Sequence, residues 1–181
     1  MDIIFISILL AGFVVLWVMA LSIIISFTSL APWVPTRRSD FERINRLADL
    51  KDGQVFYEIG SGTARLSAFI ARKNPGVRVV GVELALPLYL LTKLRTYLIG
   101  PRNLFIRFGN AFAQDYHDAD VVYLYGLTKT ANGALKEKLE NELKDGSKFI
   151  SYTFTIWDWK GQSGFIDQPS PDRVGISVCT K

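Results

Sequence analysis

The sequence predicts an α/β domain, with helices on both faces of a parallel sheet, preceded by one N-terminal transmembrane helix. Three observations carry this prediction. Asp2 is the only ionisable side chain before Arg37, so the mean hydropathy of +0.21 averages an apolar leader and a polar domain. From residue 54 onward, strand-like and helix-like patterns alternate. The domain, about 145 residues long, is large enough for one core, and the lone Cys179 excludes a disulfide scaffold.

The N-terminal apolar stretch predicts a transmembrane anchor over residues 1–30. From Ile3 to Phe27 there are 25 residues without a charge, about 37 Å long as a helix against a hydrocarbon core of roughly 30 Å. A cleaved signal peptide is the alternative, but it has a basic start and a shorter apolar stretch, whereas Asp2 precedes this one. Arg37 and Arg38 follow the anchor, so the positive-inside rule places the domain on the cytoplasmic side, or on the matrix side of a mitochondrial inner membrane.

Residues 31–53 predict an interfacial segment followed by a short amphipathic helix. The run APWVPT that opens this segment holds two prolines that end the membrane helix, and Trp33 suits the headgroup level. Ser39 and Glu42 have the spacing of a capping box, which predicts that a helix begins there and ends before the Asp52-Gly53 turn. The segment is expected to lead the chain from the membrane surface into the domain.

Residues 54–181 are predicted to form the α/β domain. Apolar runs of strand length alternate with stretches of helical periodicity, and turn signals such as Pro75-Gly76 separate them. Because parallel strands are joined by helices that cover the sheet, we expect helices on both of its faces. The expected strands are 54–59, 78–83, 104–108, 121–125, 148–153 and, at an edge, 175–180, and the expected helices are 64–73, 87–98 and 131–143.

Two glycines mark the place where the first strand turns directly into a helix. Gly60 and Gly62 permit a tight turn and the close approach of a ligand to the backbone. Such a pair also serves merely to pack a strand–helix turn, so alone it does not establish a ligand site. Glu83 favours the ligand interpretation, because it ends the next strand, where a carboxylate can accept both ribose hydroxyls of a nucleoside-containing cofactor.

The residues around this loop favour S-adenosylmethionine over a dinucleotide. A dinucleotide fingerprint has a third glycine, and position 65 is arginine. The acidic Glu58 before the glycines completes E-x-G-x-G, which looks like motif I of class I methyltransferases, in which an acidic side chain lies near the cofactor's amino group. Asn110, after the third strand, stands where that fold usually holds an acidic or amide residue near the adenine. The predicted cofactor-binding residues are Glu58, Gly60, Ser61, Gly62, Glu83 and Asn110.

Motifs along nearly the whole chain carry a more specific resemblance. They are APWVPT, YEIGSGTAR, VVGVEL, DADVVYLYG, LKEKLENELKDG and the FxxxxW of Phe154 to Trp159. Together they resemble the membrane-anchored class I (seven-strand) protein-lysine N-methyltransferase family, which includes the enzymes that modify the adenine nucleotide translocase and the ATP synthase c subunit. The resemblance implies a Rossmann-like class I methyltransferase sheet, S-adenosyl-L-methionine as cofactor, and N-methylation of a lysine in a membrane or membrane-proximal protein.

Two segments depart from the pattern of that family. The family usually continues its glycine loop with Asp-Gly-Arg, whereas this chain has Thr63-Ala64-Arg65. The prolines that the family tends to carry after the fifth strand are absent, and Thr155 and Trp157 occupy that stretch. The first departure concerns the cofactor loop, and the second concerns the identity of the substrate.

Methyl transfer to a lysine requires a neutral amine aligned with the cofactor. Alignment supplies most of the rate, but the reference lysine pKa near 10.4 leaves little neutral amine at pH 7. A desolvated aromatic channel would lower that pKa. The alternative is that these aromatic residues belong to the core or face lipid. The candidates are Tyr125 and Thr128 after the fourth strand and Tyr152, Phe154, Trp157 and Trp159 after the fifth, of which Tyr125, Thr128 and Trp159 are the predicted catalytic residues.

The sequence lacks the residues that other reaction types and partners would require. His117 is the only histidine and Cys179 the only cysteine, so neither a metal site nor a nucleophilic triad is expected. The basic excess of residues 37–181, 21 minus 16 or +5, is scattered among acidic residues, which disfavours nucleic-acid binding and suits a surface of anionic lipid. The expected partners are the lipid bilayer and a membrane-protein substrate. Two alternatives stay open: methylation of a lipid or small hydrophobic molecule, and a non-catalytic membrane-tethered cofactor-binding module.

Overall fold

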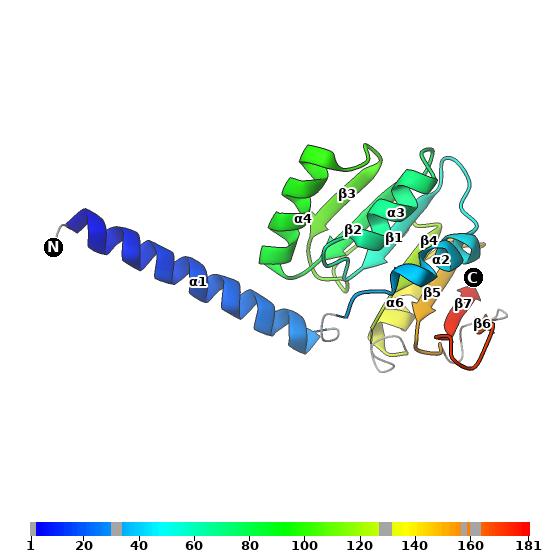
Figure 1. Cartoon of the computed structure of the whole chain (residues 1–181). Coiled ribbons are helices and arrows are strands. Elements are labelled where there is room, and N and C mark those ends of the chain that lie inside the picture. The colour runs from blue at the N-terminus through cyan, green and yellow to red at the C-terminus, as the bar shows by residue number, and fades with distance from the viewer. Residues whose placement is uncertain (1–2, 30–33, 127–131, 157–158, 160–163) are drawn as a thin grey trace.

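The domain is built on one seven-stranded sheet, seen in a computed structural model that describes residues 3–29, 34–126, 132–156, 159 and 164–181 (Figure 1). The strand order is β3-β2-β1-β4-β5-β7-β6, with β1 to β5 parallel and β7 antiparallel to both β5 and β6. The strands are β1 (Val55–Ile59), β2 (Arg78–Glu83), β3 (Leu104–Phe108), β4 (Val121–Leu124), β5 (Lys148–Tyr152), β6 (Gly164–Asp167) and β7 (Ile176–Thr180).

The observed strands β1 to β5 and β7 agree with the sequence prediction to within one residue at each end. The predicted parallel sheet is formed by β1 to β5, and the edge strands complete it with β7 antiparallel between β5 and β6. The sequence marks β6 weakly because most of this strand is exposed, including Phe165 and Ile166, so it lacks the alternation of a half-buried strand.

Helices cover both faces of the sheet, as predicted. Strand side chains alternate between the faces and so separate two cores. Phe56 and Tyr123 belong to the core under α2 and α3, whereas Tyr57 and Leu124 belong to the core that includes side chains of α6. The helices are α1 (Ile3–Ser29), the 3-10 helix η1 (Arg38–Asp40), α2 (Phe41–Ala48), α3 (Arg65–Lys73), α4 (Leu86–Ile99) and α6 (Ala134–Glu142).

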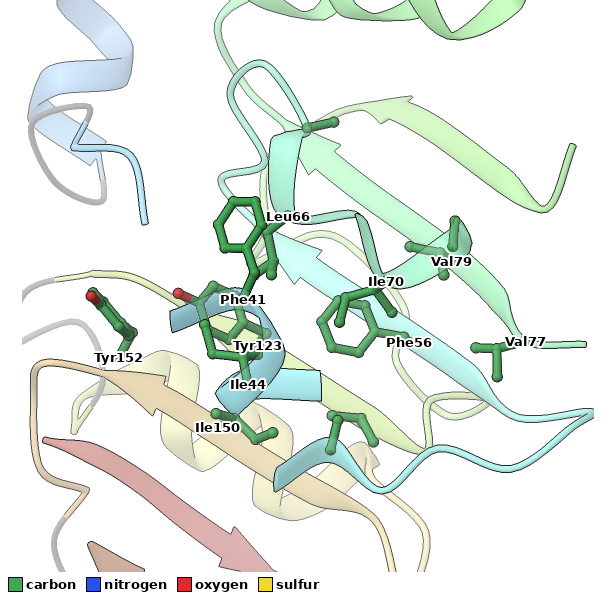
Figure 2. Packing of buried hydrophobic residues seen from close by; sticks show 14 of the residues in the cluster. Phe41, Ile44, Phe56, Leu66, Ile70, Val77, Val79, Tyr123, Ile150 and Tyr152 are labelled. Atoms are coloured by element: carbon green, nitrogen blue, oxygen red, sulfur yellow. The ribbon is translucent and has the colours of Figure 1, made fainter. Parts of the chain in front are cut away.

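Figure 2 shows how α2 closes the first core. Phe41 and Ile44 project from this helix toward Tyr123 and Ile150 of the central strands. Ile44 is completely buried, and burial of such a side chain contributes about 1.5–3 kcal/mol. The short helix that follows the apolar leader is therefore packed into the domain.

The start of α2 differs from the capping box expected at Ser39. Because η1 precedes it, α2 begins only at Phe41, with Asp40 at the N-cap and no side-chain capping bond. The buried Asp40 carboxylate instead accepts a hydrogen bond of 2.7 Å from the hydroxyl of Tyr152 at the end of β5. A contact across the core thus replaces the local cap, and sequence spacing does not reveal such a contact.

Polar contacts tie α2 and the segment before it to the sheet. The hydroxyls of Thr36 and Tyr123 lie 2.6 Å apart, and both are buried. Arg43 of α2 donates to the carboxylate of Asp167 and, at 2.8 Å, to the carbonyl of Val174. The first contact holds the residues before α2 against β4, and the second holds α2 against the end of β6 and the loop after it.

α1 is the apolar helix that the sequence predicts as an anchor. It has 27 residues, and its stretch Ile3–Leu21 has a mean hydropathy of 2.8 with no part of it buried. Figure 1 shows α1 extending away from the sheet and its covering helices. By length and composition this helix could cross a membrane.

Candidate active site

The loop after β1 forms a backbone cradle at the carboxyl edge of the sheet. Gly60 and Gly62 have φ of +69° and +54°, the left-handed conformation that favours glycine. The N–H groups of Gly60 and Ser61 donate to the carbonyl of Val82 at 2.9 and 3.0 Å, which ties the loop to β2. A Cβ added at Gly60 would meet no atom within 4 Å, and Ser61 Oγ is buried with no hydrogen-bond partner in the described chain. The cradle therefore has an open side at Gly60.

Ala64 occupies the left-handed region in the same loop, with φ of +49°. The family that the sequence resembles usually has glycine here, and an L-residue in this conformation costs about 1–2 kcal/mol. We expect Ala64→Gly to raise the free energy of unfolding by up to about 1 kcal/mol, because the relieved strain exceeds the added entropy of the unfolded chain. Urea unfolding in detergent measures this change. Ala68→Gly, inside α3, is the control and should destabilise by about 1 kcal/mol; destabilisation by both variants would contradict the prediction.

Glu83, at the end of β2, is held by the loops on either side of it. Its carboxylate accepts the N–H of Gly62 at 2.6 Å and the N–H of Ala85 at 2.7 Å. Since a carboxylate has about four acceptor sites, capacity remains for ligand hydroxyls. The hydroxyl of Thr92 in α4 donates to the Gly62 carbonyl at 2.9 Å and steadies the loop from behind. Sequence reasoning missed Thr92, because a threonine inside a helical pattern carries no signal of such a contact.

Glu58 lies deep beneath the loop, with 6% of the residue exposed. Its carboxylate accepts the backbone N–H of Ser67 at 2.9 Å and also the Ser67 hydroxyl, so it caps the first turn of α3. Burial raises the pKa of Glu58 to about 7, although the hydrogen bonds from Ser67 act in the opposite direction. The negative charge of Glu83 adds to the increase. The observed role of Glu58 is to position α3 behind the loop, and its predicted contact with the cofactor's amino group stays a prediction.

The raised pKa of Glu58 makes stability depend on pH. Between pH 4.5 and pH 7 the folded protein holds a proton on Glu58 that the unfolded chain has released, so the free energy of unfolding falls as pH rises through this window. The expected contribution is about 3 kcal/mol, fully present below pH 4.5 and lost above pH 7. Glu58→Gln should abolish this fall, whereas Ser67→Ala, which removes one donor to the carboxylate, should extend it to higher pH. Urea unfolding at several pH values tests the prediction, and an unchanged profile in Glu58→Gln would refute it.

Asn110 follows β3 and is exposed at the same edge of the sheet. Its Oδ1 accepts the N–H of Phe112 at 3.0 Å, and the N–H of the neighbouring Gly109 donates to the Glu83 carbonyl at 3.0 Å. The predicted cofactor residues therefore follow three adjacent parallel strands: Gly60 after β1, Glu83 at the end of β2 and Asn110 after β3.

The predicted catalytic residues are not brought together. Tyr125, half-buried after β4, packs edge-on against Tyr152 with ring centroids 4.8 Å apart, in the core under α2 and α3. Trp159 is buried in the other core, with its ring 5.4 Å from that of Phe149. This placement corrects the expectation that both rings line one channel, because the sheet separates the two cores. Thr128 lies outside the described residues.

One group of side chains has the composition of a metal site. Ligand atoms of Asp115, His117 and Glu142 all lie within 4.8 Å of one another. Contacts within the protein explain this proximity: His117 pairs with Asp115 at 2.6 Å, and Glu142 pairs with Lys138. The Asp115–His117 pair is exposed at the surface, so we assign no metal to it and the expectation of no metal stays a prediction.

Comparison with solved structures identifies the fold. The chain is similar to an RNA methyltransferase from Salinibacter ruber in complex with S-adenosyl-L-homocysteine, with a TM-score of 0.68 and 29% identity over 81% of this chain and 91% of that chain. It is also similar to a precorrin-6y C5,15-methyltransferase from Geobacter metallireducens GS-15, with a TM-score of 0.62 and 16% identity over 84% and 94% of the two chains. The fold is therefore the class I methyltransferase fold.

The cofactor is S-adenosyl-L-methionine, whose demethylated product is bound in the first of these structures. The residues of this chain fit it. The Glu83 carboxylate would accept its ribose hydroxyls, while the open side of the loop at Gly60 would receive its polar end. The chain is thus an S-adenosylmethionine-dependent methyltransferase.

Sequence comparison gives the family. A protein-lysine N-methyltransferase from Saccharolobus islandicus (strain REY15A) is 30% identical over 136 residues, which cover 74% of this chain and 83% of that protein. Residues 58–163, more than half of the chain, match the ANTKMT methyltransferase domain, and the match begins at Glu58 and includes the cradle and the edge of the sheet around it. This match covers the central strands of the sheet, and it shows that the chain belongs to the ANTKMT methyltransferase domain family.

Proposed function

We propose that this protein transfers a methyl group from S-adenosylmethionine to the ε-amino group of a lysine in a membrane or membrane-proximal protein. The observation that carries the proposal is the 30% identity to a protein-lysine N-methyltransferase over 83% of that protein. Membership of the family and the ordered Glu83 carboxylate beside the glycine loop support it further.

The chain's own residues bind and align the reactants. S-adenosylmethionine, when bound, supplies a methyl group on a sulfonium sulfur, which keeps the electron pair of the broken S–C bond while the lysine nitrogen bonds to the methyl carbon. The methylated amine then releases its proton to solvent. Tyr125 would form an aromatic wall beside the amine, packed against the buried Tyr152, and burial raises the pKa of Tyr152, so its hydroxyl stays neutral. An uncharged wall favours the neutral amine that attack requires.

The proposed organisation has three parts. Residues 1–30 anchor the chain in the bilayer, residues 31–53 lie at the interface and contribute α2 to the core, and residues 54–181 carry the cofactor and the chemistry. The basic pair Arg37 and Arg38 after the anchor favours a cytoplasmic, or matrix-side, domain. The hydrogen bond between Thr36 and Tyr123 supports this organisation, because it ties the interfacial segment to β4 of the sheet.

A labelling experiment tests the proposal. The full chain, reconstituted in liposomes, is incubated with membranes and methyl-labelled S-adenosylmethionine, and the label is followed into protein hydrolysates, lipid extracts and RNA. We expect methyl-lysine in the protein fraction, and none when the Glu83→Gln variant replaces the wild type. Label confined to the lipid extract would instead establish a lipid methyltransferase, and cofactor binding without any transfer would establish a non-catalytic module.

RNA is a second candidate substrate, because the Salinibacter ruber protein is an RNA methyltransferase at 29% identity. The distribution of charge favours protein over RNA. Several basic side chains of the domain pair with carboxylates, as Lys144 does with Asp120 at 2.7 Å and Lys136 with Glu140 at 3.3 Å, which reduces the field available to a phosphate backbone. Label in the RNA fraction of the same experiment would reverse this preference.

A further inference from the structure

α4 carries an apolar face on the side opposite to the sheet. The inner side of the helix holds the buried Thr92 and Tyr89, whose ring lies 5.4 Å from that of Phe108. The outer face consists of Leu90, Leu91, Leu94, Tyr97 and Leu98, which share one side of a helix by their spacing. Leu94 is 58% exposed and Tyr97 87% exposed. A helix at the edge of a water-soluble domain would carry polar residues at these positions, so the α4 outer face requires a partner.

Part of this face already meets α1. Val14, Val18 and Met19 of α1, together with Leu86 and Leu90 of α4, line an apolar cavity of about 350 Å³ between the two helices. The contact spans residues 14–19 of α1, inside the uncharged run from Ile3 to Phe27. At 1.5 Å per residue, Met19 is about 12 Å along the helix from the end of that run.

The depth of the α1–α4 contact along α1 determines whether α4 also reaches the bilayer. A run of about 37 Å must tilt in a hydrocarbon core of roughly 30 Å, so a bilayer that covers Ile3–Phe27 places Met19 about 10 Å inside the hydrocarbon boundary. Interfacial helices bury their apolar faces about 5–10 Å deep, which is close to the depth of Met19. A membrane that contains α1 therefore reaches the α4 outer face as well. Figure 1 shows α4 and β3 at one edge of the domain, with the N-terminal part of α1 extending beyond that edge.

The charges around the α4 outer face suit an anionic lipid surface. Between Glu83 and Asp115 the sequence has no acidic residue, and its charged residues are Lys93, Arg95, Arg102 and Arg107. The side chains of Lys93 and Arg95 are long enough to extend to headgroups while the helix lies in the boundary. Phe105 and Phe108 of the adjacent edge strand are about half exposed and extend the apolar surface.

We infer that the α4 outer face lies in the bilayer interface and forms a second membrane contact, which rests on the proposed anchoring by α1. Two contacts, one on each side of the cavity, would fix the orientation of the domain. Because α4 begins directly after Glu83, they would hold the cofactor edge of the sheet close to the membrane surface, where a lysine of a membrane protein is accessible.

Spin labels on the full chain test this inference. In a Cys179→Ala background, labels are placed at Leu94→Cys and Leu98→Cys, with Leu10→Cys reporting on α1 and Glu137→Cys, exposed on α6, as the water-facing control. The protein is reconstituted in nanodiscs of phosphatidylcholine and phosphatidylglycerol. We expect the labels at 94, 98 and 10 to be accessible to oxygen and protected from a water-soluble nickel chelate, and the label at 137 to show the opposite behaviour.

The possible outcomes separate this inference from the anchoring on which it rests. A label at 10 in lipid with labels at 94 and 98 in water would overturn the interfacial role of α4 and leave the anchor intact. A label at 10 in water would overturn both. Protection of positions 94 and 98 by RNA in the absence of lipid would also overturn the inference, because the partner of this face would then be a nucleic acid.

Discussion

Glu83→Gln is expected to weaken S-adenosylmethionine binding by about a hundredfold and to reduce methyl transfer accordingly. The carboxylate is held by the N–H groups of Gly62 and Ala85, so its position is set before the cofactor arrives. Hydrogen bonds to a charged acceptor contribute about 1.5–3 kcal/mol each, and weakening two of them to the ribose costs about 3 kcal/mol, or roughly two factors of ten in affinity. Isothermal titration calorimetry in detergent measures the change.

A matched control separates this effect from a general loss of charge. Glu140→Gln removes a carboxylate that is as buried as Glu83, at 8% against 6% exposed, but that lies on α6 beside Lys136. We expect its cofactor affinity to equal that of the wild type. Equal affinity in Glu83→Gln and the wild type would remove Glu83 from the cofactor site.

Gly60→Ala is expected to lower cofactor affinity by about tenfold to a hundredfold, because a methyl group placed in an occupied site costs about 1–3 kcal/mol. The added Cβ would meet no protein atom within 4 Å, so it projects into the open side of the cradle. The left-handed backbone at Gly60 adds a folding cost of about 1–2 kcal/mol. Calorimetry and thermal unfolding together measure both effects.

Gly146→Ala provides the corresponding control. Gly146 has φ of +83° and also has open space at its Cβ position, but it lies in the turn between α6 and β5, at the opposite edge of the sheet. Both variants should lose similar stability, and only Gly60→Ala should lose cofactor affinity. Loss of affinity in both would show that the effect comes from destabilisation and not from the cradle.

Much of the fold follows from local patterns. The predicted helices 64–73 and 87–98 appear as α3 and α4 with ends within one residue, because apolar periodicity and turn residues act over a few positions. Local patterns predict the structure wrongly where a side chain bonds to a residue that is distant in sequence. Ser39 does not cap α2, because Asp40 at the N-cap accepts its hydrogen bond from Tyr152 across the core.

The cofactor side of the site could be predicted better than the substrate side. Gly60, Glu83 and Asn110 each follow a parallel strand, and the ends of neighbouring parallel strands meet at one edge whatever the details of packing. Tyr125 and Trp159 follow strands too, but the direction in which each ring turns depends on the path of the chain beyond the strand. The two rings enter different cores.

By itself the sequence determined the apolar leader and the α/β domain, because these depend on composition and on spacing along the chain, and the resemblance of its glycine loop to a methyltransferase motif predicted the cofactor and the residues that would bind it. Only the tertiary structure decided that Glu58 caps α3 through Ser67 and that one apolar side of α4 is left uncovered. The physical reason is that burial and hydrogen-bond partners are set by elements far apart in sequence. The pattern of α4 is apolar on both sides, and only its place at the edge of the fold shows which side remains exposed.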